Sequence, residues 1–269
     1  MSALYLARFS GCENHAMVNG ANFVGGIVGD YRESGKSIIS CANYGVVTGT
    51  ENSVGGIAGY FNSGTIQNCA NYGDVTGTDN VGNLIGFADE CNLNNVLGTG
   101  NVTATSDTKS AGLLVGYIGN SSSTASGILA YNSSAKLTIN GTEQTGDAVK
   151  AIGEGSLTYP EKIKAFTLEQ LKSGEVAYLL NGSKSEGELA WYQKLGTDAY
   201  PVLVAEEGNT VYHGSFRYCD NTAASYSNST SENELVHVAS ATLTSPKFDA
   251  EKHIYHMGCS NEYCPEHKY

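Results

Sequence analysis

The chain has 269 residues, of which 33 are glycine, 17 are tyrosine and only 4 are proline, and charged residues make up 16% of it. This composition is typical of short strands joined by tight turns, so we expect an all-β protein. A net charge of −12 with only 15 Lys and Arg argues against nucleic-acid binding, which requires clustered basic residues. No apolar run approaches the roughly 20 residues of a membrane helix, so we expect no membrane insertion by this segment.

A glycine-rich motif recurs four times in the first half of the chain. Its clearest copy is Val-Gly-Gly-Ile-Ala-Gly-Tyr at residues 54–60, and the other copies begin at Val24, Val81 and Ala111. The last glycine of each copy stands at position 29, 59, 86 or 116, so the spacings are 30, 27 and 30 residues. Self-similarity at such a period is the signature of a repeat protein.

Each repeat contains three short runs of strand-forming residues. In the best copy they lie around Ile66 to Cys69, Asp74 to Thr76 and Val81 to Phe87, and turn residues separate them. Three strands and three corners predict one coil, and stacked coils pair each strand in parallel with its counterpart about 4.8 Å away. The sequence therefore predicts a right-handed parallel β-helix (β-solenoid) of about 27–30 residues per coil over residues 9–142.

Equivalent residues of successive coils are expected to stack in columns. We place one apolar column in the core, formed by Ile27, Ile57, Leu84 and Leu114. We also predict a ladder of inward-facing thiols, formed by Cys12, Cys41 and Cys69. The residue after each member of the apolar column is also apolar. A strand that is apolar on both faces is usually covered on both, so we expect either a further layer outside this wall or a contact surface for a partner.

The motif at 54–60, together with the run Ile-x-Asn-Cys-x-Asn-x-Gly-x-Val-x-Gly at 66–77, resembles the GLUG repeat over about half of the chain. GLUG repeats occur in bacterial cell-surface and secreted proteins, including regions of the metallopeptidases that cleave immunoglobulin A. The resemblance implies an extracellular or cell-surface location. Because repeat material begins almost at once, at Phe9, we expect the signal peptide and anchor to lie outside this chain. Asn83 and Leu113 depart from the repeat, because they replace its second glycine.

Beyond residue 142 the period ends and residues 167–181 are predicted to be helical. Thr167 and Gln170 fit a capping box, and Gly174 is expected to divide the segment into two short helices. Together with the strand-like run at 210–212, these helices are expected to form a small α+β unit over residues 143–213. It resembles the segment that closes such arrays, where it would cap the open edge of the last coil.

The last segment, residues 214–269, holds three of the seven cysteines and four of the six histidines, and it predicts a small third module. Cys259, Cys264 and His267 lie within nine residues of each other, and Cys219 is the candidate fourth ligand. Tetrahedral structural zinc takes such ligands. A disulfide in an oxidising surface environment and free thiols remain alternatives to this zinc site, which is the one cofactor that we consider.

Catalytic signatures are missing from the sequence: we find no His-Glu-x-x-His, no Gly-x-Ser-x-Gly and no phosphate-binding glycine loop. Five acidic residues are scattered over different corners of the coils and are interpreted as solvated turn residues, namely Asp74, Asp79, Asp89, Glu90 and Asp107.

We therefore predict a non-catalytic repeat region of a bacterial cell-surface or secreted protein, which serves in adhesion, in ligand binding or as a structural stalk. A glycan or a host or cell-surface protein is the expected partner, and Tyr44 and Tyr72, at matching turn positions, are the candidate contacts. The alternatives are a β-helix polysaccharide-degrading enzyme and the substrate-binding region of a larger secreted peptidase.

Overall fold

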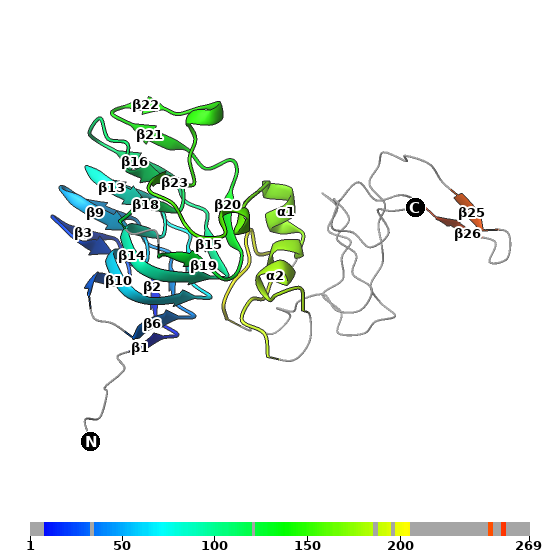
Figure 1. The fold of residues 1–269 in the computed structure, drawn as a ribbon. Helices are drawn as coiled ribbons and strands as arrows, with labels where there is room; N and C mark the ends of the chain where they lie inside the picture. The colour runs from blue at the N-terminus through cyan, green and yellow to red at the C-terminus, as the bar shows by residue number, and fades with distance from the viewer. Residues whose placement is uncertain are drawn as a thin grey trace, which may run out of the picture. The chain divides into compact units, whose positions relative to one another are not determined.

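The computed structural model describes residues 8–32, 35–119, 122–184, 188–194 and 197–204, together with the short antiparallel pair β25 (Lys247–Asp249) and β26 (Ile254–His256) (Figure 1). The contacts divide the chain into two compact units, Met1–Phe166 and Thr167–Tyr269. In the described part of the chain, no helix combines the length and the apolar character needed to cross a membrane.

The first unit is a β-solenoid of about four turns, as the repeat period predicts. Its strands form one eight-stranded, two six-stranded and one four-stranded sheet, which we call the first to fourth sheets. In Figure 1 the strands of successive coils lie side by side from blue to green.

The first sheet contains β1 (Arg8–Ser10), β6 (Lys36–Ile39), β10 (Ala58–Gln67), β14 (Ile85–Asn94), β18 (Val115–Ile118) and β23 (Ile152–Glu154), with β5 (Val28–Tyr31) paired to β10 and β19 (Thr124–Ala125) paired to β14. The second sheet contains β2 (Glu13–Asn14), β7 (Ala42–Asn43), β11 (Ala70–Asn71), β15 (Val96–Gly98), β20 (Leu129–Asn132) and β24 (Ile163–Phe166).

The third sheet contains β3 (Val18–Gly20), β8 (Val47–Gly49), β12 (Val75–Gly77), β16 (Val102–Ala104), β21 (Leu137–Ile139) and β22 (Thr142–Glu143), and the fourth contains β4 (Val24–Gly25), β9 (Asn52–Gly55), β13 (Asp79–Gly82) and β17 (Ala111–Gly112). Within these four sheets every pairing is parallel except that of β21 with β22. Parallel pairing also continues past Thr142, so the solenoid reaches Phe166, further along the chain than the repeat period alone indicates.

The register of the first sheet places the last glycines of the motif in one column. Ala58 pairs with Val28 and Ile85, and two residues later Tyr60 pairs with its own counterparts in the same coils. The glycine between each of these two pairs therefore stacks on its counterpart in the next coil. The pairing of β14 with β18 adds the fourth copy, so the column consists of Gly29, Gly59, Gly86 and Gly116. The predicted glycine column is confirmed.

The prediction of three strands per coil is wrong, because the run from Val81 to Phe87 contains a corner. β13 ends at Gly82, Asn83 and Leu84 form a bend, and β14 begins at Ile85. The corner still bonds to its neighbours, since Ile57 N–H and Ala58 N–H both donate to the carbonyl of Leu84, at 2.9 and 3.1 Å. Each complete coil therefore has four walls.

The same corner overturns both readings of the doubly apolar wall. Ile57 and Ala58 are consecutive, yet both are fully buried and both belong to one core cluster, as do Leu84 and Ile85. Because the chain turns between the two residues of each pair, both point inward. Neither an outer layer nor a partner surface is needed to explain them.

The glycines of the motif allow two walls to meet at this corner backbone to backbone. A Cβ atom built on Gly86 would lie 2.4 Å from the backbone nitrogen of Val54, and one on Gly55 would lie 2.2 Å from the carbonyl oxygen of Ala58. Both separations are shorter than a side chain tolerates, which explains why the repeat requires glycine on both sides of the turn.

A column of asparagines fills the interior between the second sheet and the corner. Asn43 Nδ2 donates to the carbonyl of Gly45 at 2.7 Å and to Asn71 Oδ1 at 2.6 Å, and Asn71 Nδ2 repeats the first bond to Gly73 at 2.7 Å. Opposite them the wall is glycine, and a Cβ on Gly56 would lie 2.1 Å from the Asn71 side chain.

In the next coil the two residue types exchange places. Gly98 occupies the position of Asn71, and Asn83 occupies that of Gly56. The Asn83 side chain reaches in from the opposite wall, where its Nδ2 donates to the carbonyl of Gly100 at 2.9 Å. The departure of Asn83 from the repeat is thus compensated by a second departure in the facing wall.

The second unit contains the two predicted helices, α1 (Leu168–Lys172) and α2 (Glu175–Leu180), divided at Gly174. Both bonds of the capping box are present: Gln170 N–H donates to Thr167 Oγ1 at 3.3 Å, and Thr167 N–H to Gln170 Oε1 at 3.0 Å. Trp191 is fully buried, and its carbonyl accepts from Asn181 Nδ2 at 2.8 Å. The strand-like run at 210–212 and nearly all of the module at 214–269 lie outside the described residues, so the segment boundaries stay predictions.

Candidate functional site

The two tyrosines predicted as ligand contacts lie in one outward-facing stack, which we call the tyrosine column and which consists of His15, Tyr44 and Tyr72. The His15 and Tyr44 ring centroids are 4.4 Å apart with planes at 5°, and those of Tyr44 and Tyr72 are 4.7 Å apart at 17°. His15 is exposed and both tyrosines are half-buried. The structure therefore brings the predicted residues together and adds a histidine to them.

Coil spacing explains this geometry. Each ring follows an asparagine of the second sheet, and Asn14, Asn43 and Asn71 point inward while the next residue points outward. Because neighbouring strands lie about 4.8 Å apart, rings at equivalent positions come into stacking contact without any adjustment of the backbone. The column therefore presents one exposed and two half-buried rings at regular intervals, and His15 Nε2 lies 3.1 Å from Glu13 Oε2.

A second stack, which the sequence analysis missed, lies on the outer face of the first sheet. We call it the aromatic ladder, and it consists of Tyr60, Phe87 and Tyr117. The centroids of Tyr60 and Phe87 are 4.7 Å apart with planes at 6°, and those of Phe87 and Tyr117 are 5.1 Å apart at 36°. The signal was available, because an aromatic residue follows the last glycine in three of the four copies of the motif.

An arginine covers one end of the aromatic ladder. The Arg32 guanidinium carbon lies 4.4 Å from the Tyr60 ring centroid and 4.8 Å from that of Phe23. Its Nε donates to Asp30 Oδ1 at 2.8 Å, so the guanidinium is already paired. The ladder is thus a half-exposed apolar strip with a neutralised ion pair at its N-terminal end.

The five acidic residues considered for catalysis have separate surroundings. Asp74 Oδ1 accepts from the backbone and side-chain nitrogens of Asn101 at 2.8 and 3.1 Å, and Glu90 Oε2 accepts from Ser63 Oγ at 2.9 Å. Asp79 bonds to Thr108. Asp89 differs from a solvated turn residue, because its Oδ1 is shielded from solvent and has no hydrogen-bond partner among the residues that the structure describes.

The first three cysteines form the predicted thiol ladder. Cys41 and Cys69 are fully buried, Cys12 is half-buried, and all are free thiols. Cys12 N–H donates to Cys41 Sγ at 3.4 Å, and Cys69 Sγ donates to the carbonyl of Gln67 at 3.2 Å. Burial raises the pKa of the Cys69 thiol well above its usual value, as expected for a small apolar core residue.

The candidate zinc ligands Cys219, Cys259, Cys264 and His267 lie outside the described residues. Among the residues that are described, no group of three or more His, Cys, Asp or Glu side chains is arranged to hold a metal ion. The zinc site therefore stays a prediction for the C-terminal segment.

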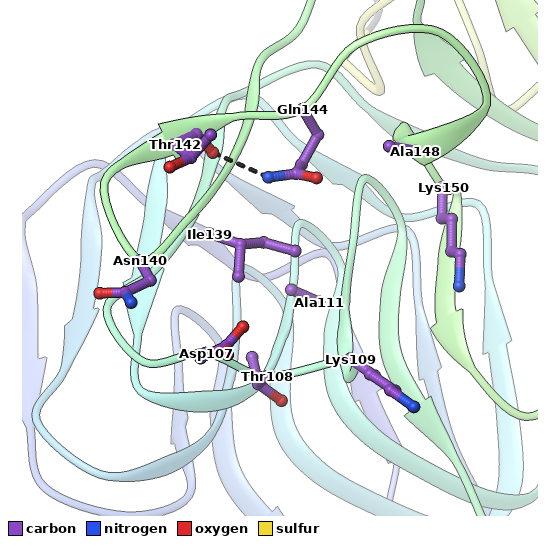
Figure 2. Close-up of a pocket in the computed structure, with 10 residues that line it drawn as sticks. All are labelled: Asp107, Thr108, Lys109, Ala111, Ile139, Asn140, Thr142, Gln144, Ala148 and Lys150. Carbon is purple, nitrogen blue, oxygen red and sulfur yellow. Dashed lines mark hydrogen bonds between the residues drawn. The ribbon is translucent and has the colours of Figure 1, made fainter.

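A cleft of about 430 Å³ lies in the solenoid, near the end of the third and fourth sheets (Figure 2). Two segments form it: the loop after β16 together with the start of β17, and the stretch from the end of β21 through the 3₁₀-helix η1 (Gly146–Ala148) to residue 150. Its lining residues are Asp107, Thr108, Lys109, Ala111, Ile139, Asn140, Thr142, Gln144, Ala148 and Lys150. Asp107 alone had been considered from the sequence.

These features define the class of the molecule as a parallel β-solenoid repeat protein, whose outer walls carry ring columns and a cleft of mixed polarity. Comparison with solved structures agrees with the fold. The chain is similar to a protein described as a putative immunoglobulin A1 protease from Bacteroides ovatus, with a TM-score of 0.52 and 20% sequence identity.

That similarity covers 73% of this chain and 57% of the Bacteroides ovatus chain, so the match spans little more than half of the longer protein. At this level of identity it shows the fold alone. No protein-family model matches the chain, and no curated protein sequence does. The resemblance to GLUG repeats therefore stays a prediction.

Proposed function

We propose that the chain is a non-catalytic, ligand-binding GLUG-type repeat region of a bacterial cell-surface or secreted protein, which acts in adhesion or as a stalk. The tyrosine column is the observation that carries this proposal. It places three outward-facing ring side chains on one wall, with centroids at 4.4 and 4.7 Å intervals.

Repetition supports a role in multipoint contact. The solenoid offers the same chemical group at the same position of successive coils, so that a ligand with its own repeat can meet several of them at once. Tyrosine suits such contacts, because it combines a large apolar area with a hydroxyl group at low entropic cost. A glycan chain or a host or cell-surface protein has this extended character.

The test is binding of the full chain to an array of glycans and host surface proteins, comparing wild type with the Tyr44→Ala/Tyr72→Ala variant. We expect the variant to lose about tenfold or more in affinity, since aromatic contact residues often contribute 2 kcal/mol or more. Thr76→Ala, a half-buried position of the third sheet, is the matched control and should bind as wild type does.

Thermal melts must show that the double variant remains folded. A wild type that binds nothing on the array, or a folded double variant that binds as wild type does, would contradict the proposal.

A second candidate is the substrate-binding region of a larger secreted peptidase, and the name of the Bacteroides ovatus neighbour, a putative immunoglobulin A1 protease, supplies the ligand that tests it. Immunoglobulin A1 therefore belongs on the array. Binding to it without cleavage supports this candidate and agrees with a non-catalytic region. Cleavage by the purified chain would overturn the proposal.

The alternative hypothesis, a polysaccharide-degrading enzyme, predicts turnover of a glycan by the purified chain. Incubation with pectic, host-type and other acidic glycans should release no reducing ends and no unsaturated products if the proposal holds. Turnover that survives repurification and is lost in Asp89→Asn or Glu90→Gln would make the chain an enzyme instead.

A further inference from the structure

The cleft near the end of the third and fourth sheets carries positive charge on a strongly acidic chain. Lys109 and Lys150 line it and lie on the same side in Figure 2, while Asp107 is the one acidic residue in the lining. The lining residues themselves therefore carry two positive charges and one negative charge, on a chain whose net charge is −12. The carboxylate of Asp79 also lies next to the cleft, where it is bonded to Thr108.

Neither lysine is neutralised within the part of the chain that the structure describes. No carboxylate forms an ion pair with the ammonium group of Lys109 or Lys150, and neither ammonium donates a hydrogen bond there. Lys136, by contrast, pairs with Glu143 at 2.8 Å on the neighbouring hairpin, so that pair contributes little net charge. The two cleft lysines are available for an external anion.

The remaining lining combines hydroxyl and amide groups with a small apolar floor. Asn140 and Gln144 supply amide groups, and Gln144 Nε2 donates to the carbonyl of Thr142 at 2.9 Å. The Thr108 hydroxyl already bonds to Asp79 and accepts from Ser110 N–H. Ile139 and Ala111 lie between the two segments in Figure 2. A sugar ring presents the matching surface, with hydroxyl groups around its edge and C–H groups on its face.

We propose that this cleft binds an acidic saccharide, with the carboxylate or sulfate of the sugar between Lys109 and Lys150. Its volume of about 430 Å³ lies in the range of about 300–1,000 Å³ that small-molecule sites occupy, and suits one or two sugar units rather than a folded partner. The tyrosine column lies in different coils and plays no part in this site, so either proposal can fail without the other.

The test is calorimetric titration of the full chain with three acidic probes: digalacturonate, sialyllactose and a sulfated heparin disaccharide. Lactose is the neutral match for sialyllactose, and inorganic sulfate serves as the bare anion. We expect at least one acidic saccharide to bind saturably, more tightly than lactose and sulfate, and more weakly as ionic strength rises.

Charge-removing variants locate the site. Lys109→Gln and Lys150→Gln should each weaken binding roughly two- to fivefold, and the double variant more than either, because each removes one of the two exposed charges that attract the same anion. Lys164→Gln, on an exposed position of β24, changes the net charge equally and should bind as wild type does. All three lysines are exposed, so the variants should fold normally.

Three outcomes would overturn the proposal: no acidic saccharide that binds saturably and more tightly than lactose, sulfate that binds as tightly as the saccharides, or unchanged affinity in the double variant.

Discussion

The ionisation of the buried Cys91 thiol is expected to make the stability of the solenoid depend on pH. Cys91 lies in β14 with 2% of its surface exposed, and its backbone N–H donates to Ser123 Oγ at 3.2 Å. Burial raises the pKa of this thiol from 9.0 to about 11. The folded chain therefore keeps the thiol neutral at a pH where the unfolded chain ionises it.

We predict that the free energy of unfolding falls between about pH 9 and pH 11 more steeply in wild type than in Cys91→Ala. The stabilising effect is complete below the pKa of the unfolded thiol and is lost as pH rises through the folded value. The difference should reach about 2.7 kcal/mol, since one pKa unit corresponds to about 1.36 kcal/mol.

Urea denaturation at a series of pH values measures both proteins. Tyrosines and the other thiols titrate in the same window but occur in both chains, so their contributions cancel. Parallel pH profiles for the two proteins would show that the Cys91 thiol ionises as readily in the folded chain as in the unfolded one.

At the scale of the strand and the corner, the exchange between Asn83 and Gly98 explains how the repeat tolerates departures. A Cβ on Gly98 would lie 2.7 Å from Asn83 Oδ1, so both walls cannot carry asparagine at the same level. With glycine in both walls, the buried carbonyl of Gly100 would lose the amide that now donates to it. Each coil therefore has room for one asparagine at this pair of facing positions, in one wall or the other.

A double-mutant cycle tests this exchange. Gly98→Asn should cost about 1–3 kcal/mol through overpacking, and Asn83→Gly about 1–3 kcal/mol through an unpaired carbonyl. The double variant restores the arrangement of Asn71 and Gly56, so its loss should fall below the sum by about 0.5–3 kcal/mol.

Thermal and urea unfolding supply the free energies. Asn83→Gly combined with Thr48→Ala, a half-buried position in β8, is the control pair and should be additive. Additive losses in the Asn83 and Gly98 pair as well would mean that the two walls do not share this space.

The same corner marks the limit of what the sequence predicts. The period, the glycine column and the capping box at Thr167 were all readable, because each depends on residue types at fixed spacings. The bend after Gly82 was not, since the run Leu84-Ile85 looks like a continuous strand until the backbone is seen to turn. Inward direction for two consecutive residues follows from that turn alone.

The cleft was unpredictable for a different reason. It joins Lys109 to Lys150, two residues outside the glycine motif that the chain brings together only at the end of the stack. No periodic signal relates them. The aromatic ladder, by contrast, was present in the motif at Tyr60 and Phe87 and was missed because the aromatic residue was treated as part of the glycine signature.

At the scale of the whole molecule, stability should depend on which coil is disturbed. In a solenoid each coil contacts only its neighbours, so an inner coil is supported on two sides and an end coil on one. Ile57 and Ile27 occupy the same column, yet Ile57 is fully buried and Ile27 is only partly buried.

We predict that Ile57→Asp costs roughly 3–5 kcal/mol, because it leaves an unpaired charge between two coils. Ile27→Asp should cost about 1–2 kcal/mol, because the end coil can open locally without disrupting the rest. Ile57→Val, with a loss of about 0.5–1.5 kcal/mol, controls for the change in volume. Thermal melts that give equal losses for the two Asp variants would show that the solenoid unfolds as one unit regardless of position.

The tyrosine column also makes the stack of coils optically readable. The rings of Tyr44 and Tyr72 lie 4.7 Å apart and within 17° of parallel, so their electronic transitions are close enough to couple. An excitonic signal in the near-ultraviolet circular dichroism would then depend steeply on the gap between two coils. Such a signal would report separation of the two coils that carry Tyr44 and Tyr72, and it needs no added label.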